Sequence, residues 1–205
     1  VSDASDSGNL KYVEKQYLGG STFVEVATEY YVISESQTSE VLQSCFTSSY
    51  NMYLVLLEML PSSNGVSFQM RMMNGGTNLE SGNKYEYVSR YHDNDGAITS
   101  NTSTGANAFI LADSVSSREY DGNVQYQLWF YVDRDRTASS ALQYHGQGRY
   151  THSNSNGRVH TTYVGGQIAD TEGNQNIDGL KFFFGSGNIT KANIRVYGVS
   201  GSNAE

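Results

Sequence analysis

The sequence predicts an all-β protein: a single domain folded as an antiparallel β-sandwich of jelly-roll type. About nine short segments rich in β-branched and aromatic residues alternate with turns rich in Gly, Asn and Ser, which is typical of sandwiches and barrels. Aromatic residues make up 12% of the 205 residues, including 16 Tyr and 8 Phe, and tyrosine suits the half-buried faces of sheets. A chain of this length commonly forms one large β domain. A closed barrel is the alternative that this pattern leaves open.

The chain divides into three parts. Residues 1–20 open with small polar side chains, so we expect an N-terminal arm or linker there. Residues 21–199 hold the predicted strands and form the sandwich domain, and residues 200–205 form a short polar tail. Because the chain starts at Val1 and shows no signal-peptide pattern, we interpret it as processed at its start or as a fragment of a longer product.

In the first half of the domain, residues 21–34 form the first predicted strand, and residues 38–42 form either a short strand or a turn. The apolar run from residue 52 to residue 57 is short and continuous, as in a strand buried on both faces. A turn at residues 61–65 then leads into the strand of residues 66–73. We predict that the two strands flanking this turn pair as a hairpin.

In the second half, residues 85–91 place tyrosines at strand spacing, whereas the polar composition of residues 92–105 indicates an exposed loop. A short apolar strand follows at residues 108–112. Alternation is clearest in residues 123–133, where every second side chain is apolar and is expected to face the core. Residues 141–150 and 157–167 are predicted to form a hairpin.

The C-terminal stretch from residue 179 to residue 199 is predicted to be a central part of the sheet core. Leu180, Phe182 and Phe184 share one face of its first strand, since side chains in a strand alternate between faces. Residues 185–188, Gly-Ser-Gly-Asn, tolerate the backbone conformations of a tight turn. We therefore expect two strands joined by a turn, forming a pair at the end of the chain.

Composition and charge exclude several classes of function. The formal net charge is −8, and an acidic chain without a basic cluster gains no counterion-release energy from phosphates, so nucleic-acid binding is not expected. No apolar run approaches the length of a membrane span. Charged residues make up only 17% of the chain, and a surface built from Ser, Thr, Asn and Gln is typical of extracellular or virion proteins.

The outer face of the strand at residues 123–133 is the candidate binding surface. Trp129, Tyr131 and Gln127 alternate with the apolar core positions and therefore share this face. Three interpretations are open: a second layer of the same domain covers the face, a neighbouring subunit contacts it, or a sugar ring stacks on it. Trp and Tyr are enriched where surfaces bind partners.

Catalytic and metal-binding chemistry has weaker support. Cys45 is the single cysteine and is expected to be buried, and the sequence contains no nucleophile motif around it and no zinc spacing among the four His. Asp93 and Asp95 in one loop, and Asp170 and Asp178 around another, present oxygen ligands of the kind that Ca²⁺ prefers. Neither loop has the EF-hand spacing, so solvated turns are the main interpretation. We expect no enzyme activity, no cofactor and no bound metal, with calcium as the alternative.

The order of several short motifs resembles that in a recurrent domain of tailed-phage virion proteins, especially tail fibres and their relatives in marine phages. The matching residues, which build sheets rather than a catalytic site, are Phe46, Tyr50, Tyr53, Pro61, Arg71, Asn74-Gly75-Gly76, Tyr85, Gly179-Leu180, Phe182, Phe184, Ser186-Gly187-Asn188-Ile189 and Tyr197-Gly198. The resemblance covers roughly residues 44–199. Residues 191–193, Lys-Ala-Asn, depart from the small Ser-Gly pair expected before the last strand.

This resemblance implies a location in the phage particle and a non-enzymatic structural role. It implies a homo-oligomer, a trimer, with other virion proteins as partners. A tail-fibre or host-attachment component is the first expectation. A capsid decoration protein and a lectin-like module that binds a host surface glycan are the alternatives.

Overall fold

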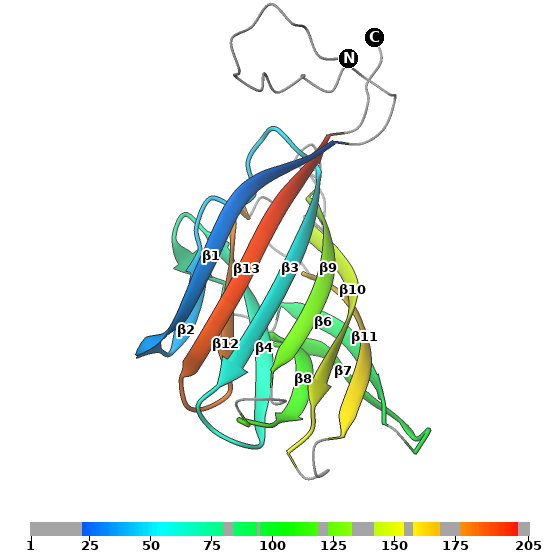
Figure 1. The fold of residues 1–205 in the computed structure, drawn as a ribbon. Helices are drawn as coiled ribbons and strands as arrows, with labels where there is room; N and C mark the ends of the chain where they lie inside the picture. The colour runs from blue at the N-terminus through cyan, green and yellow to red at the C-terminus, as the bar shows by residue number, and fades with distance from the viewer. Residues whose placement is uncertain are drawn as a thin grey trace, which may run out of the picture.

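The computed structural model describes residues 22–79, 84–93, 95–118, 123–132, 142–153, 158–168 and 177–200. It confirms the all-β fold: thirteen strands form two antiparallel sheets that pack face to face, and the described residues contain no helix (Figure 1). It follows that no described helix is available to cross a membrane. The predicted arm at residues 1–20 lies outside the described residues, as does the predicted tail apart from Ser200.

The two sheets differ in size. The large sheet has eight strands, which in spatial order are β1 (Thr22–Gln37), β13 (Ile189–Ser200), β3 (Met52–Pro61), β9 (Val124–Val132), β10 (Leu142–Thr151), β11 (Val159–Ile168), β6 (Tyr85–His92) and β7 (Ile98–Ala106). The small sheet contains β2 (Ser39–Leu42), β12 (Gly179–Phe184), β4 (Val66–Asn74) and β5 (Thr77–Asn78), and β8 (Phe109–Val115) also pairs with β4. In Figure 1 the large sheet lies in front of the small one.

Among the connections that cross from one sheet to the other, four join strands at equivalent places in the two sheets: β1 to β2, β3 to β4, β8 to β9, and β12 to β13. The large sheet contains the neighbours β1, β13, β3 and β9, and the small sheet contains their partners β2, β12, β4 and β8 in the same order. The four crossing pairs therefore stack side by side, which is the strand order of a jelly roll. The predicted fold class is confirmed.

Two predicted hairpins are wrong, although their strands and turns are present. β3 pairs with β13 and β9, not with β4, and β12 pairs with β2 and β4, not with β13. The two connections instead contact each other: the Ser62 N–H donates to the Asn188 carbonyl at 2.8 Å, and the Asn188 N–H donates to Ser62 Oγ at 2.8 Å. Because each connection crosses between the sheets, the inner faces of all four strands contribute to the shared core.

The remaining elements follow the sequence closely. β10 and β11 form the predicted hairpin, β9 alternates as predicted, and residues 39–42 form a short strand. The predicted loop at residues 92–105 is wrong, because residues 98–106 form β7 at the edge of the large sheet. Its side chains are largely exposed, so β7 is held mainly by its backbone pairing with β6 and carries no apolar alternation that a sequence could reveal.

The core lies between the sheets, and the C-terminal strands are central to it, as predicted. β13 lies between β1 and β3, and β12 lies between β2 and β4. Phe182 is fully buried and stacks on Phe68 at a ring-centroid distance of 5.9 Å. Towards β10, β11 and β6 the buried side chains are increasingly tyrosines: Tyr85, Tyr87, Tyr126, Tyr144 and Tyr150.

Candidate functional site

The outward face of the large sheet carries the candidate site. Cross-strand pairing aligns its side chains in rows, because residues paired between antiparallel strands share a face. Trp129 of β9 is paired with Leu54 of β3 and His145 of β10. Gln127 is paired in the same way with Leu56 and Gln147. Among the described residues, no strand forms a second layer over this face.

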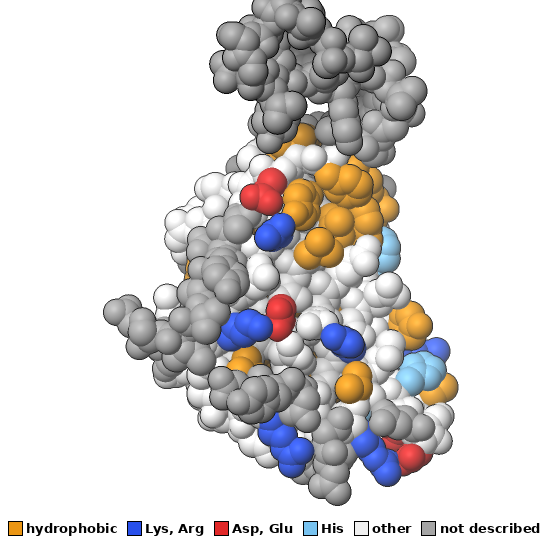
Figure 2. Space-filling model, in the orientation of Figure 1, with side chains coloured by type: hydrophobic (Ala, Val, Ile, Leu, Met, Phe, Trp, Pro, Cys, Tyr) orange, Lys and Arg blue, Asp and Glu red, His pale blue; other side chains and the backbone are white. Residues whose placement is uncertain are grey.

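An aromatic cluster occupies one end of this face. We call it the aromatic end and define it as Phe23, Leu56, Trp129 and Tyr197. The Phe23 ring lies 6.1 Å from Trp129 and 6.3 Å from Tyr197, and Phe23 is still 50% exposed. Hydrophobic side chains gather over the start of β1 and the end of β13 in Figure 2, whereas charged side chains are spread over the rest of the face. The sheet therefore presents an aromatic surface that the described chain leaves partly open.

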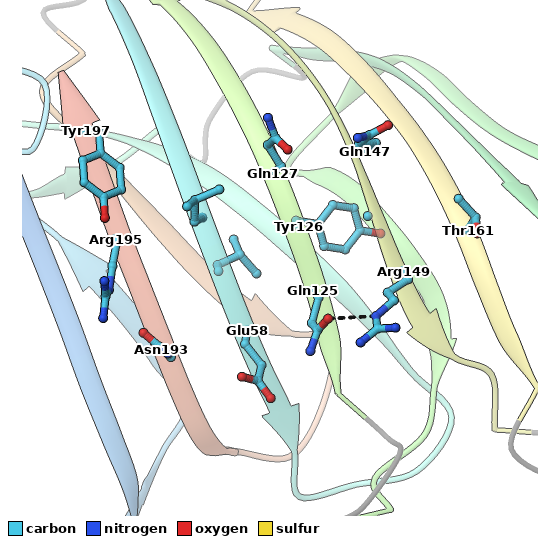
Figure 3. A pocket seen from close by; sticks show the side chains of 13 residues that line it. Glu58, Gln125, Tyr126, Gln127, Gln147, Arg149, Thr161, Asn193, Arg195 and Tyr197 are labelled. Atoms are coloured by element: carbon cyan, nitrogen blue, oxygen red, sulfur yellow. Dashed lines mark hydrogen bonds between the residues drawn. The ribbon is translucent and has the colours of Figure 1, made fainter. Parts of the chain in front are cut away.

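Next to the aromatic end is a polar hollow. It has a volume of ≈ 640 Å³ and opens to solvent. Its polar side chains come from five strands, β13, β3, β9, β10 and β11, and include Glu58, Gln125, Gln127, Gln147, Arg149, Thr161, Asn193 and Arg195 (Figure 3). The volume lies within the range of about 300–1,000 Å³ that small-ligand sites occupy.

Side-chain contacts hold the floor of the polar hollow in place. Lys191 Nζ lies 2.8 Å from Glu58 Oε1. Figure 3 shows the second contact, in which Arg149 Nε donates to Gln125 Oε1 at 2.8 Å. The hydrogen bond from Lys191 lowers the pKa of the Glu58 carboxyl group, so this residue is ionised at neutral pH. Arg195 stays charged as well, since its hydrogen bond with Tyr197 raises the pKa of the guanidinium. The hollow thus presents ionised groups of both signs, and the hydrogen bonds position Glu58, Gln125 and Arg149 on its floor.

A second hollow lies on the same face beyond β9. Gly165 of β11 is paired with His145 of β10 and Val88 of β6, so a position without a side chain separates two outward side chains. The resulting hollow has a volume of ≈ 540 Å³. We call it the Gly165 notch and define it by Gly165 and the side chains around it, Tyr131, Gln143, His145, Val88, Glu86 and Gln167.

The three residues predicted for the binding surface share the face but lie in its different parts. Trp129 belongs to the aromatic end, Gln127 lines the polar hollow, and Tyr131 borders the Gly165 notch. Trp129 is half-buried, because Phe23 packs against it, so it is not a bare stacking platform. Tyr131 is 47% exposed and offers more free ring surface.

The candidate calcium ligands are not brought together among the described residues. Asp93 Oδ1 accepts the N–H groups of Asp95 and Ala97 in the turn before β7, and Asp95 forms an ion pair with Arg158. Asp178 lies before β12 and accepts the Gly75 N–H at 3.2 Å. Asp170 lies outside the described residues. No group of three metal-ligating side chains occurs within the described part of the chain.

Cys45 is buried, as the sequence predicted. Burial raises the pKa of the Cys45 thiol to about 12, so the thiolate needed for nucleophilic attack does not form at neutral pH. Of the four histidines, His152 and His160 stack at 4.8 Å, and His145 stacks on Tyr131 at 6.1 Å. These three histidine rings therefore take part in aromatic stacking.

Sequence reasoning missed Phe23, Arg149 and Gly165. Phe23 was assigned to a strand, but its partner Trp129 lies on a strand more than a hundred residues away in the chain. Arg149 could have been placed on the outer face from the alternation of β10. Gly165 carried no signal, because a hollow depends on the side chains that neighbouring strands align beside a glycine.

Comparison with known proteins gives no further assignment. No family model matches this chain, and no curated protein or solved structure matches it. The functional interpretation therefore rests on the geometry of the outer face and on the motif resemblance noted above.

Proposed function

We propose that this chain is a non-enzymatic structural protein of a bacteriophage particle, a tail-fibre or host-attachment component that assembles as a homo-oligomer. The motif resemblance over residues 44–199 supports the setting. The aromatic end of the large sheet is the single observation that supports assembly. Its partners are further copies of the same chain, in a trimer, and other virion proteins.

The aromatic end has the composition of a subunit contact. Interfaces are enriched in Phe, Tyr and Trp at their centres and in polar residues at their rims. Phe23 and Leu56 are 50% and 39% exposed, and Glu25 and Arg195 lie beside them on β1 and β13. Leaving this surface in water is unfavourable, and monomeric proteins rarely expose large contiguous apolar patches. A second copy of the chain would cover it.

Light scattering of the purified chain tests this assembly. We expect a mass of three times the 22.6 kDa monomer, and we expect Phe23→Ser combined with Tyr197→Ser to reduce it to the monomer mass. Ile98→Ser is the matched control, because Ile98 is 60% exposed but lies on β7, away from the aromatic end. A wild-type chain that stays monomeric at all concentrations would contradict the proposal.

A capsid decoration protein would use the same kind of subunit contact, so oligomer mass does not separate it from an attachment protein. Binding to intact cells distinguishes the two roles. A host-attachment protein labelled with a fluorophore adsorbs to intact bacteria and competes with phage for adsorption. A decoration protein binds to capsids lacking it and leaves adsorption unchanged.

The polar hollow favours a second candidate, a lectin-like module. Sugar hydroxyls both donate and accept hydrogen bonds, so they match planar amide, carboxylate and guanidinium groups held at fixed positions. The hollow supplies all three types within one face. Binding on a glycan array that disappears in Gln127→Ala and Arg149→Ala, with unchanged thermal unfolding, would support this role. An array without any bound glycan would contradict the lectin-like role.

A further inference from the structure

We propose that the Gly165 notch is a binding site for one pyranose ring of a neutral carbohydrate. The inference deepens the lectin-like candidate and rests on it, but it assigns the ligand to a part of the face outside the polar hollow. Four features carry it: an aromatic wall, a fixed pair of hydrogen-bonding groups, a local charge, and a glycine that leaves the space open.

The aromatic wall is the Tyr131 ring. It is 47% exposed and stacks on the His145 ring at a centroid distance of 6.1 Å and an interplanar angle of 20°. This contact restricts the Tyr131 ring before a ligand arrives, and restriction of this kind lowers the entropic cost of binding. The apolar C–H face of a pyranose packs against such a ring, and the tyrosine hydroxyl stays available to water or to the sugar.

On the opposite side of the notch lies a pair of polar groups. Gln167 Nε2 donates to Glu86 Oε2 at 2.8 Å, across the paired strands β11 and β6. The amide and the carboxylate keep further acceptor and donor positions, because each group forms more than one hydrogen bond. Two adjacent hydroxyls of a sugar ring fit such a pair, one as donor to the carboxylate and one as acceptor from an amide.

The charge in the notch favours a neutral sugar. Glu86 is the charged side chain among the notch residues, and no lysine or arginine is among the residues that line the described hollow. A uronic or sialic acid would bring a second carboxylate close to Glu86, and like charges at short range are unfavourable. The notch therefore differs in charge from the polar hollow, which contains Arg149 and Arg195.

Gly165 leaves the space that the ring would occupy. A Cβ at this position would lie 3.5 Å from the Tyr144 carbonyl oxygen and 3.9 Å from His145 Cβ, both ordinary contacts, so a side chain can begin here without a clash at its Cβ. The adjacent Gly166 faces the core instead, where a Cβ would lie 2.5 Å from the Glu86 carbonyl oxygen. The packing of the core thus requires glycine at position 166, whereas at position 165 no described contact requires it.

Gly165→Gln provides the test, because its side chain fills the notch from a position that the core does not need. The probe is an array of neutral oligosaccharides of glucose, galactose and mannose, together with sialylated and uronic-acid counterparts, followed by titration calorimetry with the strongest neutral binder. We expect neutral glycans to bind the wild-type chain, Gly165→Gln to abolish binding with an unchanged unfolding temperature, and Tyr131→Ala to weaken it about tenfold, from the loss of ring stacking. Ile98→Ser is the matched surface control and should bind as the wild type does.

Three results would overturn the inference, and they differ in whether the lectin-like role is kept. Neutral-glycan binding that survives Gly165→Gln but is lost in Gln127→Ala and Arg149→Ala would move the ligand to the polar hollow and keep the lectin-like role. Binding of acidic glycans alone would overturn the notch and leave the lectin-like role to the polar hollow, whereas an array on which no glycan binds would overturn both. None of these results bears on the oligomeric structural role, which the mass measurement decides separately.

Discussion

The two halves of the sandwich fill their interiors with different side chains. In the half made by the four crossing pairs, the space between the sheets is filled mainly by Phe, Met, Leu, Ile and Val, including the stacked rings of Phe68 and Phe182. In the half made by β10, β11 and β6, the large buried side chains are mostly tyrosines. In this second half, β8 is the strand of the small sheet that packs against β10, β11 and β6.

Glycines of β10 make room for buried side chains of the neighbouring strand β9. Gly146 and Gly148 of β10 face the core beside Leu128 and Tyr126 of β9, and a Cβ at Gly148 would lie 2.5 Å from the Tyr126 ring. The Tyr126 hydroxyl donates to the Leu111 carbonyl of β8 at 2.7 Å, so the tyrosine spans the gap between the sheets. In the crossing half, Gly198 of β13 leaves room for the Tyr50 ring in the same way, so the two halves differ in the share of tyrosines among their large buried side chains.

Alanine at position 148 should disturb the packing of β10 against Tyr126 most strongly. Its Cβ would meet both the Tyr126 ring and the Gln125 carbonyl oxygen at 2.5 Å, and overpacking of this kind costs about 1–3 kcal/mol. Urea denaturation of Gly148→Ala should therefore show a clear loss of unfolding free energy. Gly165→Ala is the control, since its Cβ meets ordinary contact distances. Equal midpoints for the two variants would contradict the proposed match of glycine and tyrosine.

Two buried tyrosine hydroxyls, those of Tyr126 and Tyr144, differ in their hydrogen bonds and should differ in their effect on stability. Tyr126 also accepts a hydrogen bond from Thr162 Oγ1 at 2.9 Å, so Tyr126→Phe leaves two buried partners unpaired and should cost about 1–3 kcal/mol. The Tyr144 hydroxyl is buried without a hydrogen-bond partner among the described residues. Tyr144→Phe should therefore leave the unfolding free energy unchanged or raise it. A greater loss in Tyr144→Phe than in Tyr126→Phe, measured by urea denaturation, would show that the hydroxyls do not act as described.

The smallest expected effect is a pH dependence at the far end of the same half. Burial, and secondarily the stacked His152 ring, lower the pKa of His160 below 6.5. The unfolded chain then binds a proton on His160 more readily than the folded chain does, so stability is complete above pH 6.5 and falls as the pH decreases towards the folded pKa. Urea midpoints should decline over this range in the wild type and decline less steeply in His160→Gln. Parallel declines would show that other groups dominate.

Several features of the fold could be predicted from local sequence patterns. The alternation in residues 123–133 placed Trp129 outside and Phe130 inside correctly, because a strand changes face at every residue. Residues 179–184 were likewise recognised as a core strand from their phenylalanines. The edge strand β7 was missed, because its largely exposed side chains resemble those of a loop. Only its pairing with β6 makes it a strand.

The candidate site could be predicted only in part. Trp129, Tyr131 and Gln127 were placed on one face from alternation alone. Their separation into the aromatic end, the polar hollow and the notch depends on Phe23, Arg149 and Gly165, which come from three other strands. Local patterns in one sequence do not specify which distant strands become neighbours, because that choice depends on long-range packing.

The sequence by itself determined where most strands begin and end, which side chains face inwards, and that turns rich in Gly, Ser and Asn separate them. These properties are local, because they depend on backbone conformation and on the two-residue period of a strand. The tertiary structure alone decided that the turns at residues 62–65 and 185–188 connect two sheets rather than two paired strands. The same turn residues permit both connections, and the choice depends on burying the apolar faces of strands that lie far apart in the chain.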